Sequence, residues 1–183
     1  LVSRFHPAVI VSSGLALGAL GYLFVMFFGS RNDLLLMLSF MFLGLSVGAA
    51  QTISNDLILS SVPANKAGAA SAISETAYEF GTVLGTVVIG GMLTAIYRAQ
   101  AMVPAGLSAD AAHAAGETLG GATAVAGQLP SDLSAELLHS AHAAFDSGVL
   151  VTATFSAVLL AVLSVFTYRM LRSAPAELEK AEH

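Results

Sequence analysis

The sequence contains no cysteine and few charged residues: only 10% of its 183 residues are Asp, Glu, Lys or Arg. Without cysteine, disulfide bonds and thiolate metal sites are excluded. The seven basic residues are scattered and are outnumbered by twelve acidic ones, which argues against a nucleic-acid-binding surface. Glycine-rich phosphate loops and the GxSxG and HExxH signatures are also missing, so the sequence gives no support to an ATPase or another enzyme.

Hydrophobic residues, by contrast, make up 56% of the chain, and the mean hydropathy is +0.79. A soluble domain typically carries about 25% charged residues. A chain this poor in polar groups cannot cover its apolar surface in water. We therefore expect lipid to be its solvent.

Four long apolar segments are separated by turn signals and a loop. A helix needs about 20 apolar residues to cross a bilayer, and we expect transmembrane helices at 9–28, 34–60, 68–97 and 144–172. The predicted fold class is an all-α membrane protein. Residues 99–143 are expected to form a long loop with one short amphipathic helix, and 173–183 a polar tail with a frayed end.

The basic residues are distributed unevenly between the two ends of the predicted spans. Four spans place both termini on one side of the membrane, and that side carries five basic residues against two on the other. The five are Arg4, Lys66, Arg169, Arg172 and Lys180, and the two are Arg31 and Arg98. The positive-inside rule then puts both ends in the cytoplasm and the long loop outside.

The third predicted span carries two glutamates. Glu75 and Glu79 are four residues apart and share a helix face, which Thr82 and Thr86 continue. At about 1.5 Å per residue, Glu79 lies roughly 15–18 Å from the cytoplasmic helix end. A charge at this depth costs at least about 2.5 kcal/mol, so two on one face indicate a function.

Proton exchange is the chemistry that such a pair favours, because desolvation and a neighbouring like charge both stabilise the neutral carboxylic acid. We therefore expect Glu79 and Glu75 to take part in proton coupling. The structural alternative is that Glu75 is solvated near the interface, or pairs with Lys66 or the helix-end amides. For Glu79, the structural alternative is a carboxylate whose hydrogen-bonding needs are met within the protein and which has no role in proton exchange.

Polar residues also occur near the end of the second span. Gln51, Asn55 and Asp56 are candidates to line the same pathway. Alternatively, Asp56 is solvated at the membrane–water interface, and Gln51 forms a hydrogen bond to a neighbouring helix.

Glycine pairs with three residues between them predict close helix packing. Gly14 and Gly18 form such a pair in the first span, and Gly81 and Gly85 form another in the third. Small residues at this spacing let helix backbones approach each other.

Three histidines lie in the long loop: His113, His139 and His142. Glu136, His139 and His142 are spaced three apart, which would suit a metal ion. The favoured interpretation is the solvated face of a loop helix, and we expect neither a metal nor a cofactor.

Several segments resemble one family of transporters. Residues 55–72 (NDLILSSVPANKAGAASA) and 74–81 (SETAYEFG) look like the major facilitator superfamily, most of all its drug:proton antiporters with fourteen transmembrane helices. Residues 143–148 (AAFDSG), the end of the last span at 168–172 (YRMLR) and the opening RFHP at 4–7 are similar to that family as well.

The resemblance implies that the four spans are helices eleven to fourteen, in the C-terminal bundle of an inner-membrane exporter. It implies alternating access and export of small hydrophobic or cationic substrates, driven by protons flowing inward. The family's acidic pair carries over to Glu75 and Glu79. The N-terminal part of the transporter is absent from this chain, which begins with Leu1, so the fragment alone is not expected to transport.

Two other interpretations stay open at this point. The parent protein could export one specific metabolite, with the glutamates recognising a substrate amine or hydroxyl. The chain could also be a non-transporting four-helix membrane module.

Overall fold

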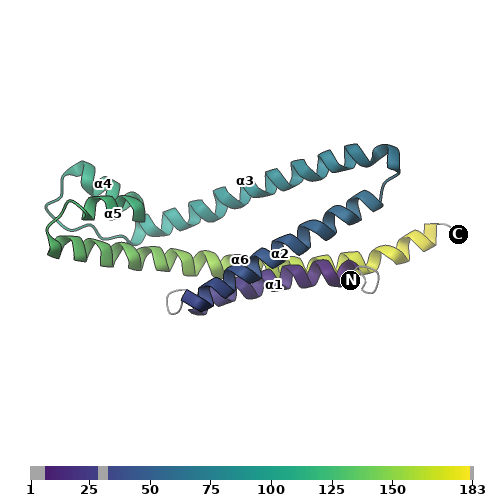
Figure 1. The fold of residues 1–183 in the computed structure, drawn as a ribbon, viewed down its shortest axis with the longest axis horizontal. Coiled ribbons are helices and arrows are strands. Elements are labelled where there is room, and N and C mark those ends of the chain that lie inside the picture. The colour runs from purple at the N-terminus through teal and green to yellow at the C-terminus, as the bar shows by residue number, and fades with distance from the viewer. Residues whose placement is uncertain (1–6, 29–32, 182–183) are drawn as a thin grey trace. The chain divides into compact units, whose positions relative to one another are not determined.

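A computed structural model describes residues 7–28 and 33–181, which are almost entirely helical (Figure 1). No strand occurs in this part of the chain. The elements in chain order are α1 (Pro7–Phe28), α2 (Asp33–Ser60), the 3-10 turn η1 (Ala64–Lys66), α3 (Ala67–Gln100), α4 (Ala109–Glu117), α5 (Leu119–Ala126) and α6 (Ser131–Ala181).

Four helical segments are long and apolar enough to cross a membrane. They lie at Ala8–Phe28, Asp33–Ser60, Ala64–Gln100 and Ser131–Arg172. The predicted all-α fold with four membrane helices is therefore confirmed. Pro63 separates the second span from the third: its backbone is extended, and its carbonyl accepts a hydrogen bond from the Lys66 amide at 2.8 Å.

The long connection differs from its sequence-based description. Instead of one short helix, residues 99–143 contain α4, α5 and the beginning of α6. Helix α6 starts at Ser131 rather than at 144, because the stretch after Pro130 is rich in Ala and Leu and contains no break before Gly148. It also continues to Ala181, so the segment predicted as a tail extends the same helix.

The chain divides into two compact units that share α3 and α6. Unit 1 comprises residues 1–81 and 153–183, and unit 2 comprises residues 82–152. Each unit is described separately below.

Unit 1 is held together by close contacts of α1. Gly18 meets α2, where an added Cβ would lie 2.5 Å from the hydroxyl oxygen of Ser46. The Ser46 hydroxyl donates to the Gly14 carbonyl at 2.7 Å, and the Ser164 hydroxyl of α6 donates to the Ser12 carbonyl at 2.7 Å. Such packing and interhelical hydrogen bonds, each worth about 0.6–2 kcal/mol, hold helices together where lipid removes the hydrophobic driving force.

The surface of unit 1 has the polarity of a membrane protein. Ser39 and Ser46 are buried, whereas Leu34 is 76% exposed and Phe40 is 61% exposed. Large apolar side chains outside and small polar ones inside are unfavourable in water but suit a hydrocarbon solvent.

Unit 2 has a core of its own, formed by the end of α3, the short helices α4 and α5, and the first part of α6. Its buried members are Tyr97, Ala115, Ala122, Ala126, Leu137, Ala141 and Ala144. The Tyr97 hydroxyl donates to the Ala115 carbonyl at 2.9 Å. Ser108 and Thr118 cap α4 and α5, because each side-chain oxygen accepts a hydrogen bond from a first-turn backbone amide.

Candidate functional site: the acidic face of helix α3

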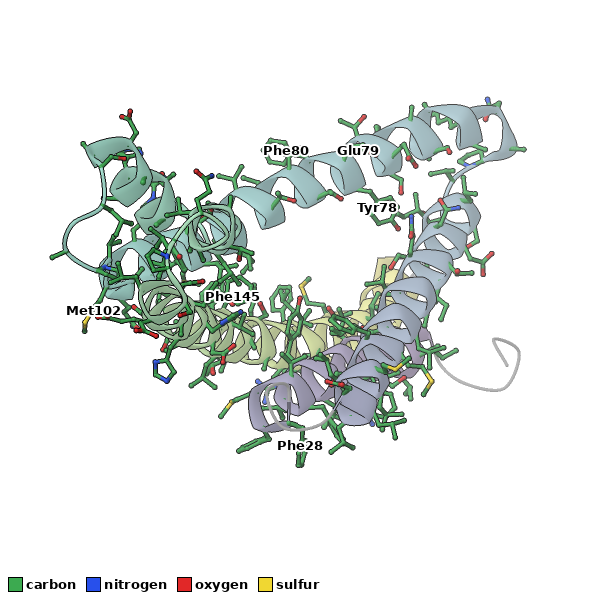
Figure 2. The ribbon with its side chains drawn as sticks, turned by 60° about the vertical axis from the view of Figure 1, so that its left-hand side comes forward. Phe28, Tyr78, Glu79, Phe80, Met102 and Phe145 are labelled. Atoms are coloured by element: carbon green, nitrogen blue, oxygen red, sulfur yellow. The ribbon has the colours of Figure 1, made fainter. Side chains whose placement is uncertain are left out.

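The first half of α3 has three distinct faces, because successive residues are rotated by about 100° around the helix. One face meets α2. Ser74 on this face is 6% exposed, and the Tyr78 hydroxyl donates a long hydrogen bond to the Gln51 carbonyl at 3.4 Å. Figure 2 shows Tyr78 on the side of α3 nearer α2, with Glu79 pointing from the other side.

Glu75 and Glu79 occupy the second face, and both side chains are exposed. Within the described residues neither glutamate forms an ion pair. Lys66, the cation that could have neutralised Glu75, does not pair with it, and α3 carries no basic residue before Arg98. The structure thus leaves both carboxylates without a neutralising charge in this part of the chain.

The threonines that continue the predicted stripe belong to unit 2. Thr82 and Thr86 are both exposed, and the Thr86 hydroxyl donates to the Thr82 carbonyl at 2.9 Å. This bond within the helix satisfies the hydroxyl of Thr86.

The three polar candidates on α2 differ in whether they contact α3. The backbone carbonyl of Gln51 accepts the hydrogen bond from the Tyr78 hydroxyl of α3. Asn55 and Asp56 are exposed near the end of α2. Gln51 is therefore the one of the three for which a hydrogen bond to α3 is observed.

The two glycine pairs lie in different surroundings. An added Cβ at Gly14 would contact α2 at 3.7 Å, and one at Gly18 would overlap Ser46. An added Cβ at Gly81 or Gly85 would meet no other atom within 4 Å among the described residues. A packing role for Gly81 and Gly85 stays a prediction.

The loop histidines are not gathered into a site. His113, His139 and His142 are exposed. In the described ranges, no three side chains of a metal-ligating type come together.

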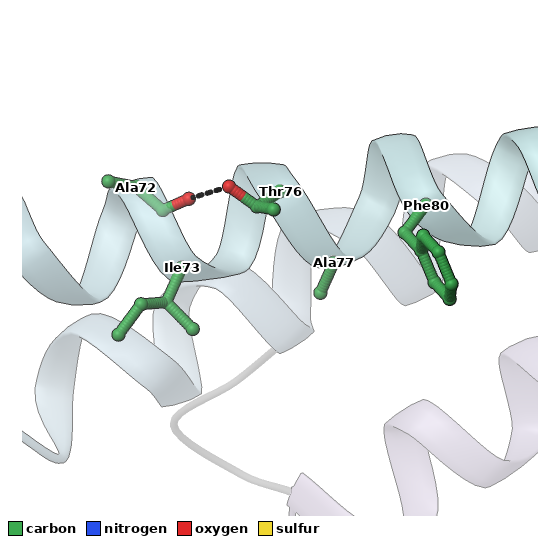
Figure 3. Close-up of a pocket in the computed structure, with 5 residues that line it drawn as sticks. All are labelled: Ala72, Ile73, Thr76, Ala77 and Phe80. Carbon is green, nitrogen blue, oxygen red and sulfur yellow. Dashed lines mark hydrogen bonds between the residues drawn. The ribbon is translucent and has the colours of Figure 1, made fainter.

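The third face of α3 carries a shallow, open apolar groove that sequence reasoning missed (Figure 3), and all of its lining residues belong to α3. Its lining residues are Ala72, Ile73, Thr76, Ala77 and Phe80. The Thr76 hydroxyl donates to the Ala72 carbonyl at 2.8 Å, so the one polar side chain in the groove is already satisfied. The spacing of Ile73, Ala77 and Phe80, at i, i+4 and i+7, was the available signal for an apolar face.

Taken together, α3 combines a face from which Tyr78 bonds to α2, a face with two carboxylates that no described cation neutralises and a face with an open apolar groove. A carboxylate in apolar surroundings can hold a proton and can bind a cation once that proton is released. This pairing of charge and apolar surface suits small cations with hydrophobic parts.

The chain is similar to two efflux or resistance proteins of bacteria. It is 49% identical over 160 residues to the multidrug efflux pump LfrA of Mycolicibacterium smegmatis, covering 86% of this chain and 31% of that protein. It is 32% identical over 175 residues to the methyl viologen resistance protein SmvA of Salmonella typhimurium, covering 95% of this chain and 35% of that protein. No family model and no solved structure matches the chain.

The chain thus spans about a third of the length of these relatives. The predicted resemblance to drug-efflux transporters is confirmed. The relatives also point to a transporter rather than an enzyme, and together with the four apolar helices they indicate a multi-pass membrane protein.

Proposed function

We propose that this chain is the C-terminal part of a proton-coupled multidrug efflux transporter of the major facilitator superfamily. It would supply four membrane helices to a larger protein in the inner membrane. The complete transporter would export hydrophobic or cationic compounds in exchange for protons, and Glu79 and Glu75 would carry the exchange.

One observation supports this proposal most strongly: two carboxylates lie one turn apart on a helix long enough to span the membrane, and no described cation neutralises them. Exposure of that face to hydrocarbon would cost at least about 2.5 kcal/mol of free energy for each charged carboxylate. The face must therefore meet water or protein in the complete transporter. A water-accessible path at the midplane is the arrangement that alternating access requires.

The exchange would follow from competition for one carboxylate. A proton from outside neutralises Glu79, which makes the site poor at holding a cation. Loss of that proton towards the cytoplasm restores the charge and allows a cationic substrate to bind. Glu75, one turn closer to the cytoplasm, would raise the local negative potential and stabilise the proton on its neighbour.

Neighbouring residues would position this face. The hydrogen bond from Tyr78 to Gln51 joins α3 to α2 one residue away from Glu79. We propose that Gln51, Asn55 and Asp56 on α2, together with Thr82 and Thr86, line the pathway. Gly14, Gly18, Gly81 and Gly85 would allow close helix packing.

The proposed topology places both ends of the chain in the cytoplasm and the connection 99–143 outside, following the distribution of basic residues. The remaining part of the transporter and the lipid bilayer would be the direct partners of the four helices. Neither a cofactor nor a nucleic acid has a role in this scheme.

The test uses the full-length transporter in energised vesicles. Glu79→Gln keeps the size of the side chain but cannot ionise, so we expect it to reduce proton-coupled efflux to background. Glu136→Gln provides the matched control, because Glu136 is an exposed acid in unit 2. Efflux and proton counter-flow that persist unchanged in the Glu79 variant would rule out the assigned role.

A panel of substrates separates this proposal from an exporter of one metabolite. We expect resistance to several unrelated lipophilic cations in cells that express the full-length protein. Transport restricted to a single amino acid, sugar or siderophore would favour the metabolite exporter. Absence of any transport by the full-length protein would favour a non-transporting membrane module.

A further inference from the structure

We propose that the C-terminal part of α6 binds the phosphate of an anionic phospholipid through Arg172, whose guanidinium is held in place by Tyr168. This inference goes beyond the proposed function. It concerns the lipid around the chain, and it requires neither proton coupling nor a particular substrate.

The apolarity of α6 does not by itself fix the depth of this helix in a bilayer. Its 51 residues, Ser131–Ala181, correspond to a length of about 76 Å, whereas the hydrocarbon core is about 30 Å thick. Residues 147–168 contain no charged side chain and span about 33 Å. With this run centred in the hydrocarbon, Tyr168 lies at its boundary. Arg172 lies about 6 Å further along the helix, at the level of the headgroups.

Tyr168 and Arg172 form a preorganised pair at this level. Nη1 of Arg172 donates a hydrogen bond to the Tyr168 hydroxyl oxygen at 2.8 Å. The central guanidinium carbon lies 5.7 Å from the centroid of the tyrosine ring, which is within the range of cation–π attraction. The hydrogen bond uses one of five N–H donors, so a planar pair of donors remains for a phosphate.

The sequence of α6 offers Arg172 no carboxylate at the spacings that bring helical side chains together. Residues three or four positions apart are neighbours on a helix. For Arg172 these positions hold Tyr168, Arg169, Pro175 and Ala176. The acid that would neutralise this cation is therefore not supplied by a neighbouring turn of its own helix.

Arg98 shows the contrasting case. This arginine lies in the last turn of α3, and it pairs with the carboxylate of Glu117. Arg172 is exposed as Arg98 is, but no ion pair joins it to an acid among the side chains that the structure describes. Exposure alone does not explain this difference. The counter-charge of Arg172 is therefore expected to come from outside the described residues.

A phospholipid suits this part of α6 better than a free anion does. The turn before the pair exposes apolar side chains on two sides of the helix, where Val165 is 55% exposed and Phe166 is 58% exposed. Acyl chains would cover these side chains while the headgroup phosphate meets the guanidinium. A free anion would satisfy only the charge. Charge complementarity and apolar surface together select an anionic lipid.

The test uses the full-length transporter in nanodiscs of phosphatidylcholine with increasing fractions of phosphatidylglycerol, and it measures the midpoint of thermal unfolding. We expect phosphatidylglycerol to raise the midpoint of the parent protein. Arg172→Gln should require about fivefold more phosphatidylglycerol for half of this rise, as loss of one basic residue near an anionic surface predicts. Tyr168→Phe keeps the ring but loses the hydroxyl acceptor, and we expect a smaller shift of about two- to threefold.

Arg98→Gln is the matched control, because Arg98 is an exposed arginine that already has an acidic partner. It should show the phosphatidylglycerol dependence of the parent. Each variant is compared with itself in pure phosphatidylcholine, so a general loss of stability cancels. If Arg172→Gln yields no folded protein, Tyr168→Phe provides the test.

Four results would overturn the inference. They are an Arg172→Gln variant that responds to phosphatidylglycerol as the parent does, an equal shift in the Arg98 control, the same rise produced in phosphatidylcholine by inorganic phosphate, and no response of the parent. The last result would assign Arg172 to a carboxylate elsewhere in the transporter. None of these measurements requires transport, so failure of this inference is distinguishable from failure of the proposed function.

Discussion

Unit 1 and residues 97–144 of unit 2 place polar and apolar side chains in opposite ways. In unit 1, serines are buried at helix contacts, while Leu34 and Phe40 are largely exposed. In unit 2, Tyr97 and Leu137 are buried in a small core, and the acid Glu117 pairs with Arg98 and lies 3.9 Å from His113. We interpret the contrast as two solvents, lipid around unit 1 and water around residues 99–143. The parts of α3 and α6 that belong to unit 2 expose apolar side chains such as Val87 and Val151, as unit 1 does.

The contrast extends to the carboxylates. Glu117 has a cationic neighbour, Arg98, although it lies on the short helix α4, where an exposed unpaired charge costs little. Glu75 and Glu79 have none within the described residues, although they lie on a membrane-spanning helix. The chain spans about a third of its relatives, so the rest of the transporter supplies the surroundings of this pair, and its role in proton exchange stays a proposal.

The largest effect on transport is expected from a variant that gives Glu79 a cationic neighbour, as Glu117 has in Arg98. Glu75→Lys places an ammonium group one turn from Glu79, where it would hold the carboxylate in its charged form. We expect proton-coupled efflux to fall to background. Glu75→Gln, which removes a charge without adding a cation, should reduce efflux less than Glu75→Lys does, and equal activity of the two variants would contradict the account.

Crowding the α1–α2 contact should have the next largest effect, on stability. Gly18→Ala puts a methyl group 2.5 Å from the Ser46 hydroxyl oxygen. We expect a loss of about 1–3 kcal/mol, seen as a lower midpoint of thermal unfolding in detergent. Gly44→Ala is the control, because a Cβ there meets no atom within 4 Å in the described part of the chain.

A buried hydroxyl in unit 2 should contribute less. Tyr97→Phe removes the donor to the Ala115 carbonyl, and we expect a loss of about 1 kcal/mol, together with faster proteolysis within residues 99–130. Tyr22→Phe changes a half-buried tyrosine in unit 1 and serves as a control. Equal proteolysis rates in both variants would show that the Tyr97 bond does not stabilise unit 2.

The smallest effect should come from the exposed ion pair. The Arg98 side chain is 53% exposed, so Arg98→Gln should destabilise unit 2 by less than about 1 kcal/mol and leave transport unchanged. A loss as large as that of Gly18→Ala would mean that the environment of unit 2 is less polar than the comparison assumes.

Much of the fold could be predicted from sequence, because uninterrupted apolar runs of membrane length have few alternatives to helices. Pro63 also identified the end of α2 correctly. The loop was less predictable. The core around Tyr97 depends on contacts between Ala115, Leu137 and other residues far apart in the chain, and no local pattern specifies them.

The candidate site was predicted only in part. The spacing of Glu75 and Glu79 identified the acidic face, because their charge contrasts with the surrounding apolar residues. The groove beside Phe80 was missed, because Ile73, Ala77 and Phe80 look like ordinary membrane-facing residues in the sequence. Only the structure shows which face of α3 forms a hydrogen bond to α2.

Chemical accessibility of position 79 tests the central claim most directly. The chain has no native cysteine, so Glu79→Cys in a cysteine-free full-length transporter can be labelled at one site with a small, water-soluble thiol reagent. We expect slow but measurable labelling at position 79, while the exposed α6 position altered by Val162→Cys stays unlabelled in lipid. Labelling at position 79 as fast as at an Asn65→Cys site in the η1 turn, or no labelling at all, would contradict a protein-lined, water-accessible path.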